Sequence, residues 1–148
     1  MLTRILVAAL AVLTAAGLWR MARWYWRPRL SLPNAPVLGR EAGGVRLAMV
    51  VRNEGAAKSR RFRVRLIRAE RREGGKWVRV EAIRAARPRD PKLPRKGIPS
   101  HGSATLEVDR LLPAEPGRYR VEVAVINGEE KRSSYVIDIE AVHSEASS

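Results

Sequence analysis

The stretch 60-RRFRVRLIR-68 decides the fold of this chain, because apolar side chains and arginines alternate along most of it. Successive side chains of a β-strand point to opposite faces of a sheet. Phe62, Val64 and Leu66 therefore share one face, which we expect to be buried. The other face carries three neighbouring cations: Arg61, Arg63 and Arg65.

The same alternation recurs on both sides of this stretch. It runs through VRLAMVVRN (45–53), TLEVD (105–109), RYRVEVAVI (118–126) and YVIDIE (135–140). Turn-forming residues separate these segments, including Asn127-Gly128, a pair typical of tight β-hairpins. Short alternating strands joined by such turns predict an all-β fold. We expect an immunoglobulin-like antiparallel β-sandwich of about seven strands, preceded by one N-terminal transmembrane or signal-anchor helix.

A further strand is predicted over WVRVEAI (77–83), after the turn Glu73-Gly74-Gly75-Lys76. Its alternation points Val78 and Val80 towards the core and leaves Trp77 on the polar face. Trp77 is therefore a candidate exposed anchor for a partner, or alternatively a cap on the edge of the core.

The N-terminal segment is apolar and ends in a cluster of aromatic residues and arginines. Residues 5–19 (ILVAALAVLTAAGLW) are uncharged but form only about 22 Å of helix, whereas a bilayer core is about 30 Å thick. The cluster that follows extends the helix to about residue 26, or roughly 33 Å, before Pro28 ends it. Its side chains suit the membrane–water interface: Trp19, Arg20, Arg23, Trp24, Tyr25, Trp26 and Arg27.

Two arguments about the side of the membrane that the domain occupies lead to opposite predictions. The arginines after the apolar run would place the domain in the cytoplasm by the positive-inside rule. Small immunoglobulin-like domains behind a signal anchor are more often outside, and we favour that side. The prediction is a single-pass protein of the cell membrane with an extracytoplasmic domain; cleavage of a signal peptide after Ala16 is the alternative.

We divide the chain into four parts on these grounds. Residues 1–29 form the membrane anchor, 30–39 a linker with two prolines, 40–142 the sandwich and 143–148 a polar tail. Within the sandwich, residues 85–101 hold four prolines and no periodicity, which predicts a long exposed loop.

Two motifs resemble the CARDB and fibronectin-III-like group of β-sandwich domains. Residues 50–55 (VVRNEG) end a strand in N-x-G, as such domains commonly do. Later, Leu112-Pro113 is followed by 116–121 (PGRYRV), which matches a G-x-Y-x-V strand of the same group.

The resemblance covers roughly residues 35–141 and implies a tyrosine corner at Tyr119. It also implies a role in adhesion, spacing, or protein or glycan contact outside the cytoplasm. The arginine-rich stretch 60–68 and the loop 85–101 depart from the pattern of the group.

The residues that enzymes and metal sites need are scarce. The chain has no cysteine, which excludes disulfides and thiolate ligands, and its two histidines, His101 and His143, have no partner at metal-ligand spacing. We predict no catalytic residues, no metal, no cofactor and no enzymatic activity. Glu107 and Asp109 are expected to pair across strands with arginines: Arg46 or Arg52.

The charge is unevenly distributed. The chain holds 29 basic and 15 acidic residues, a net charge of +14, and 24 of the basic residues are arginine. Residues 40–98 carry 19 basic and 6 acidic side chains, whereas 99–148 carry 5 and 9. If strand 118–126 pairs with 60–68, the two strands form one basic face. Together with Trp77, this face is our candidate surface for binding a partner or an anion: Arg61, Arg63, Arg65, Arg118 and Arg120.

The arginine excess has three interpretations: genome composition, surface ion-pair networks of the kind found in thermophile proteins, and recognition of an anion. If the arginines serve to recognise an anion, we predict an accessory or scaffold subunit that contacts membrane lipid. It would bind another membrane or cell-envelope protein or an acidic glycan. The alternative is a cytoplasmic-facing or secreted domain that binds nucleic acid or anionic lipid. Nucleic acid is disfavoured because the strands lack interleaved aromatic residues for stacking, and no small-molecule substrate is indicated.

Overall fold

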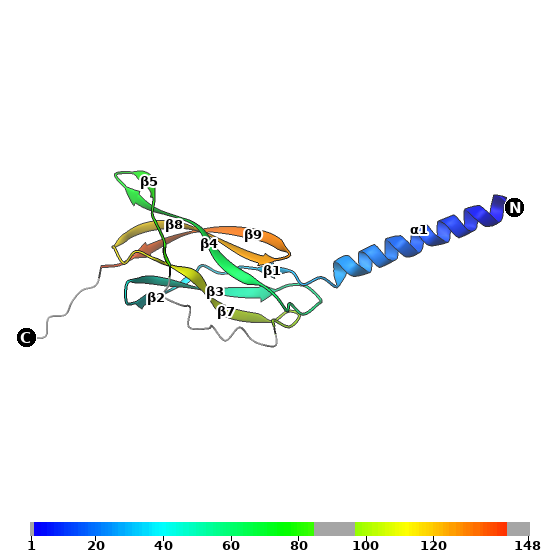
Figure 1. Ribbon diagram of the computed structural model, residues 1–148, viewed down its shortest axis with the longest axis horizontal. Coiled ribbons are helices and arrows are strands. Elements are labelled where there is room, and N and C mark those ends of the chain that lie inside the picture. Colours follow the sequence, from blue (N-terminus) through cyan, green and yellow to red (C-terminus); the bar gives the residue numbers. More distant parts are fainter. Residues whose placement is uncertain (1, 85–96, 142–148) are drawn as a thin grey trace, which may run out of the picture.

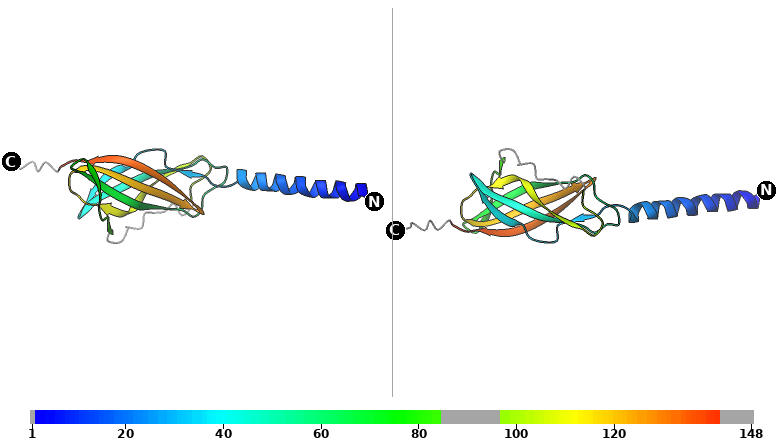
Figure 2. Two further views of the ribbon diagram at one scale, coloured as in Figure 1. Left: turned by 90° about the horizontal axis from the view of Figure 1, so that it is seen from above. Right: turned by 90° about the horizontal axis from the view of Figure 1, so that it is seen from below.

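The described residues form one N-terminal helix and a two-layered β domain (Figure 1). The computed structural model describes residues 2–84 and 97–141. Helix α1 (Leu2–Tyr25) extends away from the domain, so the start of α1 and the end of β9 lie at opposite ends of the molecule (Figures 1 and 2). The tail 143–148, His143 and most of the loop 85–101 lie outside the described residues.

The predicted antiparallel β-sandwich is confirmed. One sheet has the order β1-β3-β7-β6, with β2 also paired to β3, and the other has the order β5-β4-β8-β9. Every pairing is antiparallel. The strands are β1 (Leu30–Ser31), β2 (Val37–Glu41), β3 (Gly44–Asn53), β4 (Arg63–Glu73), β5 (Lys76–Arg79), β6 (Ile83–Arg84), β7 (Ser103–Leu112), β8 (Gly117–Asn127) and β9 (Glu129–Ile139).

This strand order is that of the immunoglobulin fold. The strands β1, β3, β7 and β6 take the places of A, B, E and D, and β4, β8 and β9 take those of C, F and G, with β5 added at the edge. Tyr119, near the start of β8, donates its hydroxyl hydrogen to the Glu115 carbonyl oxygen at 2.9 Å. This is the hydrogen bond of a tyrosine corner, which many unrelated sandwich domains share.

The inward faces of the long strands form the core, as their alternation predicts. In β3 the side chains of Leu47, Met49 and Val51 are fully buried, and in β8 those of Val121 and Val123 are fully buried. Burying such side chains is the main favourable contribution to folding, at about 25 cal/mol per Å² of apolar surface. The residues that carried the period-2 signal therefore hold the two layers together.

A β-bulge interrupts β4 between Leu66 and Arg68, where its register against β8 shifts. The extra residue reverses which face the following side chains occupy. Without it, the alternation set by Leu66 would send Arg68 and Glu70 into the core. With it, Ala69 is buried in the core and Arg68 is exposed.

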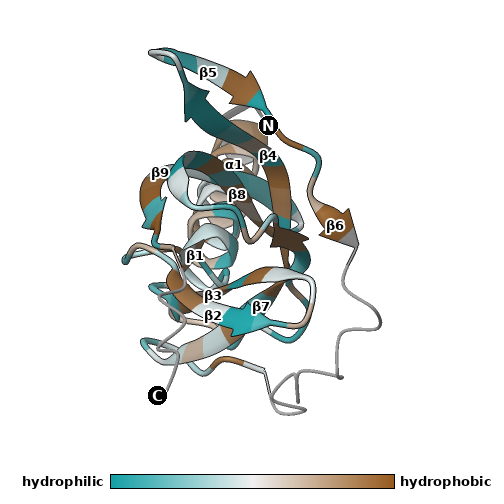
Figure 3. Cartoon of the chain, turned by 90° about the vertical axis from the view of Figure 1, so that its left-hand side faces the viewer, coloured by the Kyte–Doolittle hydropathy of each residue, from teal (hydrophilic) through white to brown (hydrophobic). Residues whose placement is uncertain are grey.

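The predicted strand 77–83 is divided between the two sheets. Its first part, β5, pairs with β4, and its last part, β6, pairs with β7. The β4–β5 hairpin projects beyond the sandwich (Figure 3). Val78 is therefore 43% exposed, contrary to the prediction that it points inward, whereas Val80 packs against the core.

Two other segments are more ordered than expected. Residues 30–39, expected to be a linker, supply β1 and most of β2, which cover the two ends of one side of β3. Pro33 and Pro36 separate them, because proline has no N–H to donate to the ladder. Ile98, expected in an exposed loop, is fully buried and bridges to Ser59.

Candidate partner-binding face and membrane junction

The predicted basic face is only partly assembled. Arg63 and Arg65 are exposed on the outer side of β4, opposite Ile126 and Ala124 of β8. Arg61 is also exposed but precedes β4. None of these three arginines has an ion pair within the described part of the chain.

Arg118 and Arg120 do not join that cluster. The predicted pairing of β4 with β8 is present, but its antiparallel register places Arg120 beside Glu70, five residues further along β4 than Arg65. Arg118 lies beyond it and pairs with Asp138, with 3.2 Å between Nε and Oδ1. The prediction of one continuous surface is therefore wrong, because the antiparallel register separates the two groups by roughly 15 Å.

Trp77 and Arg120 belong to a second, internally paired cluster around Glu70. Glu70 is 3% exposed; its carboxylate accepts a hydrogen bond of 2.7 Å from Arg120 Nε, and Arg68 forms an ion pair with it. The guanidinium of Arg120 lies over the Trp77 ring, 4.9 Å from its centroid. Trp77 is half-buried beneath this cation rather than a free anchor.

Hydrogen bonding by Arg120 lowers the pKa of Glu70, against the opposing effect of its desolvation. A carboxyl whose pKa is lower in the folded state stabilises that state above its unfolded-state pKa of about 4.3, and this stabilisation disappears as the pH falls through the folded-state value.

Substitution Glu70→Gln is therefore expected to lower the unfolding temperature at pH 7, with a difference from the wild type that shrinks below about pH 4. Thermal unfolding followed by circular dichroism between pH 3 and 8 measures this. Glu140→Gln serves as the control, because that exposed carboxylate has no ion pair with any described residue. A constant difference at all pH values would show that the ion pair does not stabilise the fold.

The other sheet contains a similar ion pair. Arg46 is 8% exposed and contacts the carboxylates of Glu41 and Glu107; its Nη1 atom lies 3.2 Å from Glu107 Oε2. The hydrogen bonds that Arg46 donates to the Glu41 carboxylate raise the pKa of Arg46, against the opposing effect of its desolvation. The predicted pairing of Glu107 is therefore confirmed, whereas Asp109 instead accepts a hydrogen bond from the Leu66 amide at 3.1 Å.

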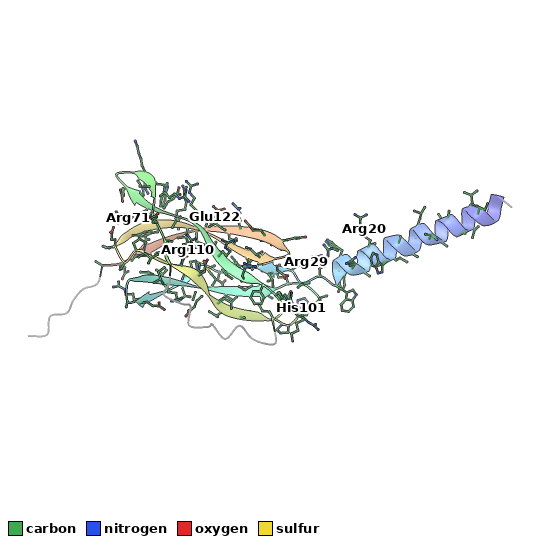
Figure 4. All side chains as sticks on the ribbon, viewed as in Figure 1. Arg20, Arg29, Arg71, His101, Arg110 and Glu122 are labelled. Carbon is green, nitrogen blue, oxygen red and sulfur yellow. The ribbon has the colours of Figure 1, made fainter. Side chains whose placement is uncertain are left out.

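Helix α1 is long and apolar enough over Ile5–Tyr25 to cross a membrane. The aromatic side chains of α1, Trp19, Trp24 and Tyr25, are exposed, and so is Trp26 just beyond the helix. Two arginines pack on these rings: Arg23 of the predicted interface lies over Trp19, 4.9 Å from the ring centroid, and Arg29, which follows the predicted set, lies over Trp24 at 3.9 Å. Figure 4 shows Arg20 on the helix and Arg29 at the adjoining end of the sandwich.

A buried asparagine joins the helix to the sandwich. Asn53, at the end of β3, is fully buried and accepts hydrogen bonds on Oδ1 from the amides of Arg29, at 3.1 Å, and Gly55, at 3.0 Å. Its Nδ2 atom donates to carbonyl oxygens of two segments, the loop that follows β3 and the segment that precedes β7, at 2.8–3.2 Å: Ala57, Ile98 and Pro99. We call this arrangement the Asn53 junction.

The chain next to Asn53 packs directly on the segment that follows the helix. The Glu54 amide donates to the Arg29 carbonyl oxygen at 2.7 Å. A Cβ atom at Gly55 would lie 2.2 Å from the Arg27 carbonyl oxygen, so only glycine allows this approach. An open groove of about 460 Å³ flanks the junction, between Trp24, Arg27 and Arg29 on one side and the β8–β9 hairpin on the other.

Among the described residues there is no group of three or more His, Asp or Glu side chains that could hold a metal ion. His101 is exposed at the helix end of the sandwich (Figure 4). Comparisons with protein-family models, with curated proteins and with solved structures found no match.

Proposed function

We propose that this chain is a non-enzymatic, single-pass membrane protein whose sandwich binds an acidic partner through Arg63 and Arg65. One observation carries the proposal. Along the pairing of β4 with β8, Arg68, Arg118 and Arg120 each have a carboxylate partner. Arg63 and Arg65 have none among the residues that the structure describes.

The register explains why these two cations stay unpaired. They face Ile126 and Ala124, which carry no charge, and the nearest acid along β8, Glu122, lies 3.6 Å from Arg132 instead. Two residues apart on one strand, they are about 7 Å from each other and repel. An acidic protein surface would relieve this repulsion and gain charge-assisted hydrogen bonds, which fits an accessory or scaffold subunit.

The test is charge reversal on the two arginines. Partners co-purified with the full chain from native membranes are expected to fall about tenfold or more for Arg63→Glu/Arg65→Glu. The matched control is Arg72→Glu/Arg79→Glu, which makes the same charge change on two exposed arginines of the β4–β5 hairpin. Equal recovery of partners by all three proteins would exclude this face; partners lost on nuclease treatment would instead support the nucleic-acid alternative.

We also propose that the domain lies on the extracytoplasmic side, as small immunoglobulin-like domains behind an anchor usually do. The arginines that follow the apolar part of α1 argue for the opposite side. Protease added to intact cells is expected to digest the sandwich, and protection until the cells are lysed would place the domain in the cytoplasm.

A further inference from the structure

The connection between α1 and the sandwich is short and fixed. Helix α1 ends at Tyr25 and β1 begins at Leu30. The residues between them are held in three ways. The Arg29 amide donates to Asn53 in the Asn53 junction, the Arg29 carbonyl oxygen accepts from the Glu54 amide, and Gly55 packs on Arg27. The loop that follows Asn53 therefore lies at the level of Arg27.

The length of the helix places this level relative to a bilayer. The apolar span Ile5–Tyr25 has 21 residues, or about 31 Å of helix, which matches a hydrocarbon core of about 30 Å. Tyr25 then lies at the edge of that core, and Arg20 and Arg23, within about two turns below it, reach the interface by snorkelling. Arg27 and the loop 54–61 fall within the headgroup layer, which is some 5–8 Å thick on each side.

The charge at this end of the sandwich is positive. The segments 26–31, 54–61 and 127–131 carry six basic and three acidic side chains. All three acids have local partners: Glu54 accepts a hydrogen bond from Ser31, Glu129 lies 4.0 Å from Arg27 and Glu130 pairs with Arg132. Within the described residues, three exposed cations of the loop have no ion pair: Lys58, Arg60 and Arg61.

We propose that Lys58, Arg60 and Arg61 bind the headgroups of anionic phospholipids and hold the end of the sandwich against the bilayer. The Asn53 junction keeps these three side chains at headgroup depth whether or not lipid is bound. Each cation near an anionic membrane surface strengthens association by about fivefold. The inference rests on the membrane anchor of the proposed function, but not on the proposed partner of Arg63 and Arg65.

The test uses the full chain in lipid nanodiscs. Because the chain has no cysteine, a single cysteine at Ser103, exposed at the start of β7, takes one fluorophore. Nitroxide on a small fraction of lipid headgroups quenches it by proximity. We expect stronger quenching in discs of phosphatidylcholine with phosphatidylglycerol than in phosphatidylcholine alone, and loss of this increase on adding salt.

A matched pair of variants makes the result specific. The triple substitution Lys58→Glu/Arg60→Glu/Arg61→Glu is expected to abolish the increase. Substituting one lysine and two arginines of the distal hairpin, Arg72→Glu/Lys76→Glu/Arg79→Glu, is expected to preserve it. Equal quenching in both discs by an inserted wild-type chain, or equal loss in both variants, would overturn the lipid contact and leave the anchor standing. Failure to insert into either disc would overturn both.

Discussion

Substitution Asn53→Ala is expected to destabilise the sandwich by about 3 kcal/mol. It removes the acceptor of the Arg29 and Gly55 amides and the donor to three carbonyl groups. A buried polar group left without a partner costs about 1–3 kcal/mol, and several would be left here. For a domain of about 110 residues, 3 kcal/mol corresponds to a fall of at least about 12 °C in unfolding temperature.

Urea or thermal unfolding of the chain in detergent micelles, followed by its β-sheet circular dichroism, measures this effect. Asn34→Ala is the control, because Asn34 is exposed and the structure gives its side chain no hydrogen bond; its effect should stay within about 0.5 kcal/mol. Comparable stability of the two variants would mean that the junction contributes nothing to the fold.

The layered fold was predictable because burial on one face imposes period 2 on each strand by itself. The burial of Val121 and Val123, and of Leu47 and Met49, can be predicted from the alternation within each strand's own sequence. The split of 77–83 was not predictable in this way. Val78 alternates correctly, but its hairpin extends past the opposing sheet, and a local pattern carries no information about where that sheet ends.

The candidate site depended on relations between strands, which a single sequence does not reveal. Arg65 and Arg120 have the same local pattern, yet Arg120 meets Glu70 and Arg65 meets Ala124. A bulge at Leu66/Arg68 sets this register, and no residue there marks it in advance. Glu70 was missed for the same reason, because unbroken alternation would have assigned it to the core.

Asn53 was noticed as part of the N-x-G motif, but as a strand end. Its partners at Arg29 and Ile98 are distant in sequence, so only the folded chain shows that the motif fastens helix α1 to the sandwich. The Trp/Arg cluster was predicted from composition alone, since aromatic rings and arginines at the end of an apolar run suit a membrane interface whatever they contact, and its place at an interface stays a prediction.

Substitution Gly55→Ala is expected to release the sandwich from the helix end. The new Cβ would meet three backbone atoms, none of which can rotate away: the Arg27 carbonyl oxygen at 2.2 Å, the Arg29 amide nitrogen at 2.6 Å and the Pro28 Cα at 2.9 Å. Either the loop or the segment 27–29 must move. We expect a loss of about 1–3 kcal/mol, as for overpacking elsewhere, and breakage of the hydrogen bond between Glu54 and Arg29.

Spin labels on two introduced cysteines, at Met21 on α1 and Ser134 on β9, report this release as a distance distribution. A fixed junction gives a narrow distribution in the wild type, and Gly55→Ala should broaden it. Gly39→Ala is the control, because the nearest atom to its Cβ would be 4.0 Å away. Broad distributions in all three proteins would show that the junction already flexes. The fold would then not keep Lys58 and Arg60 at the depth of the headgroups. Their contact with lipid would have to hold the domain against the bilayer by itself.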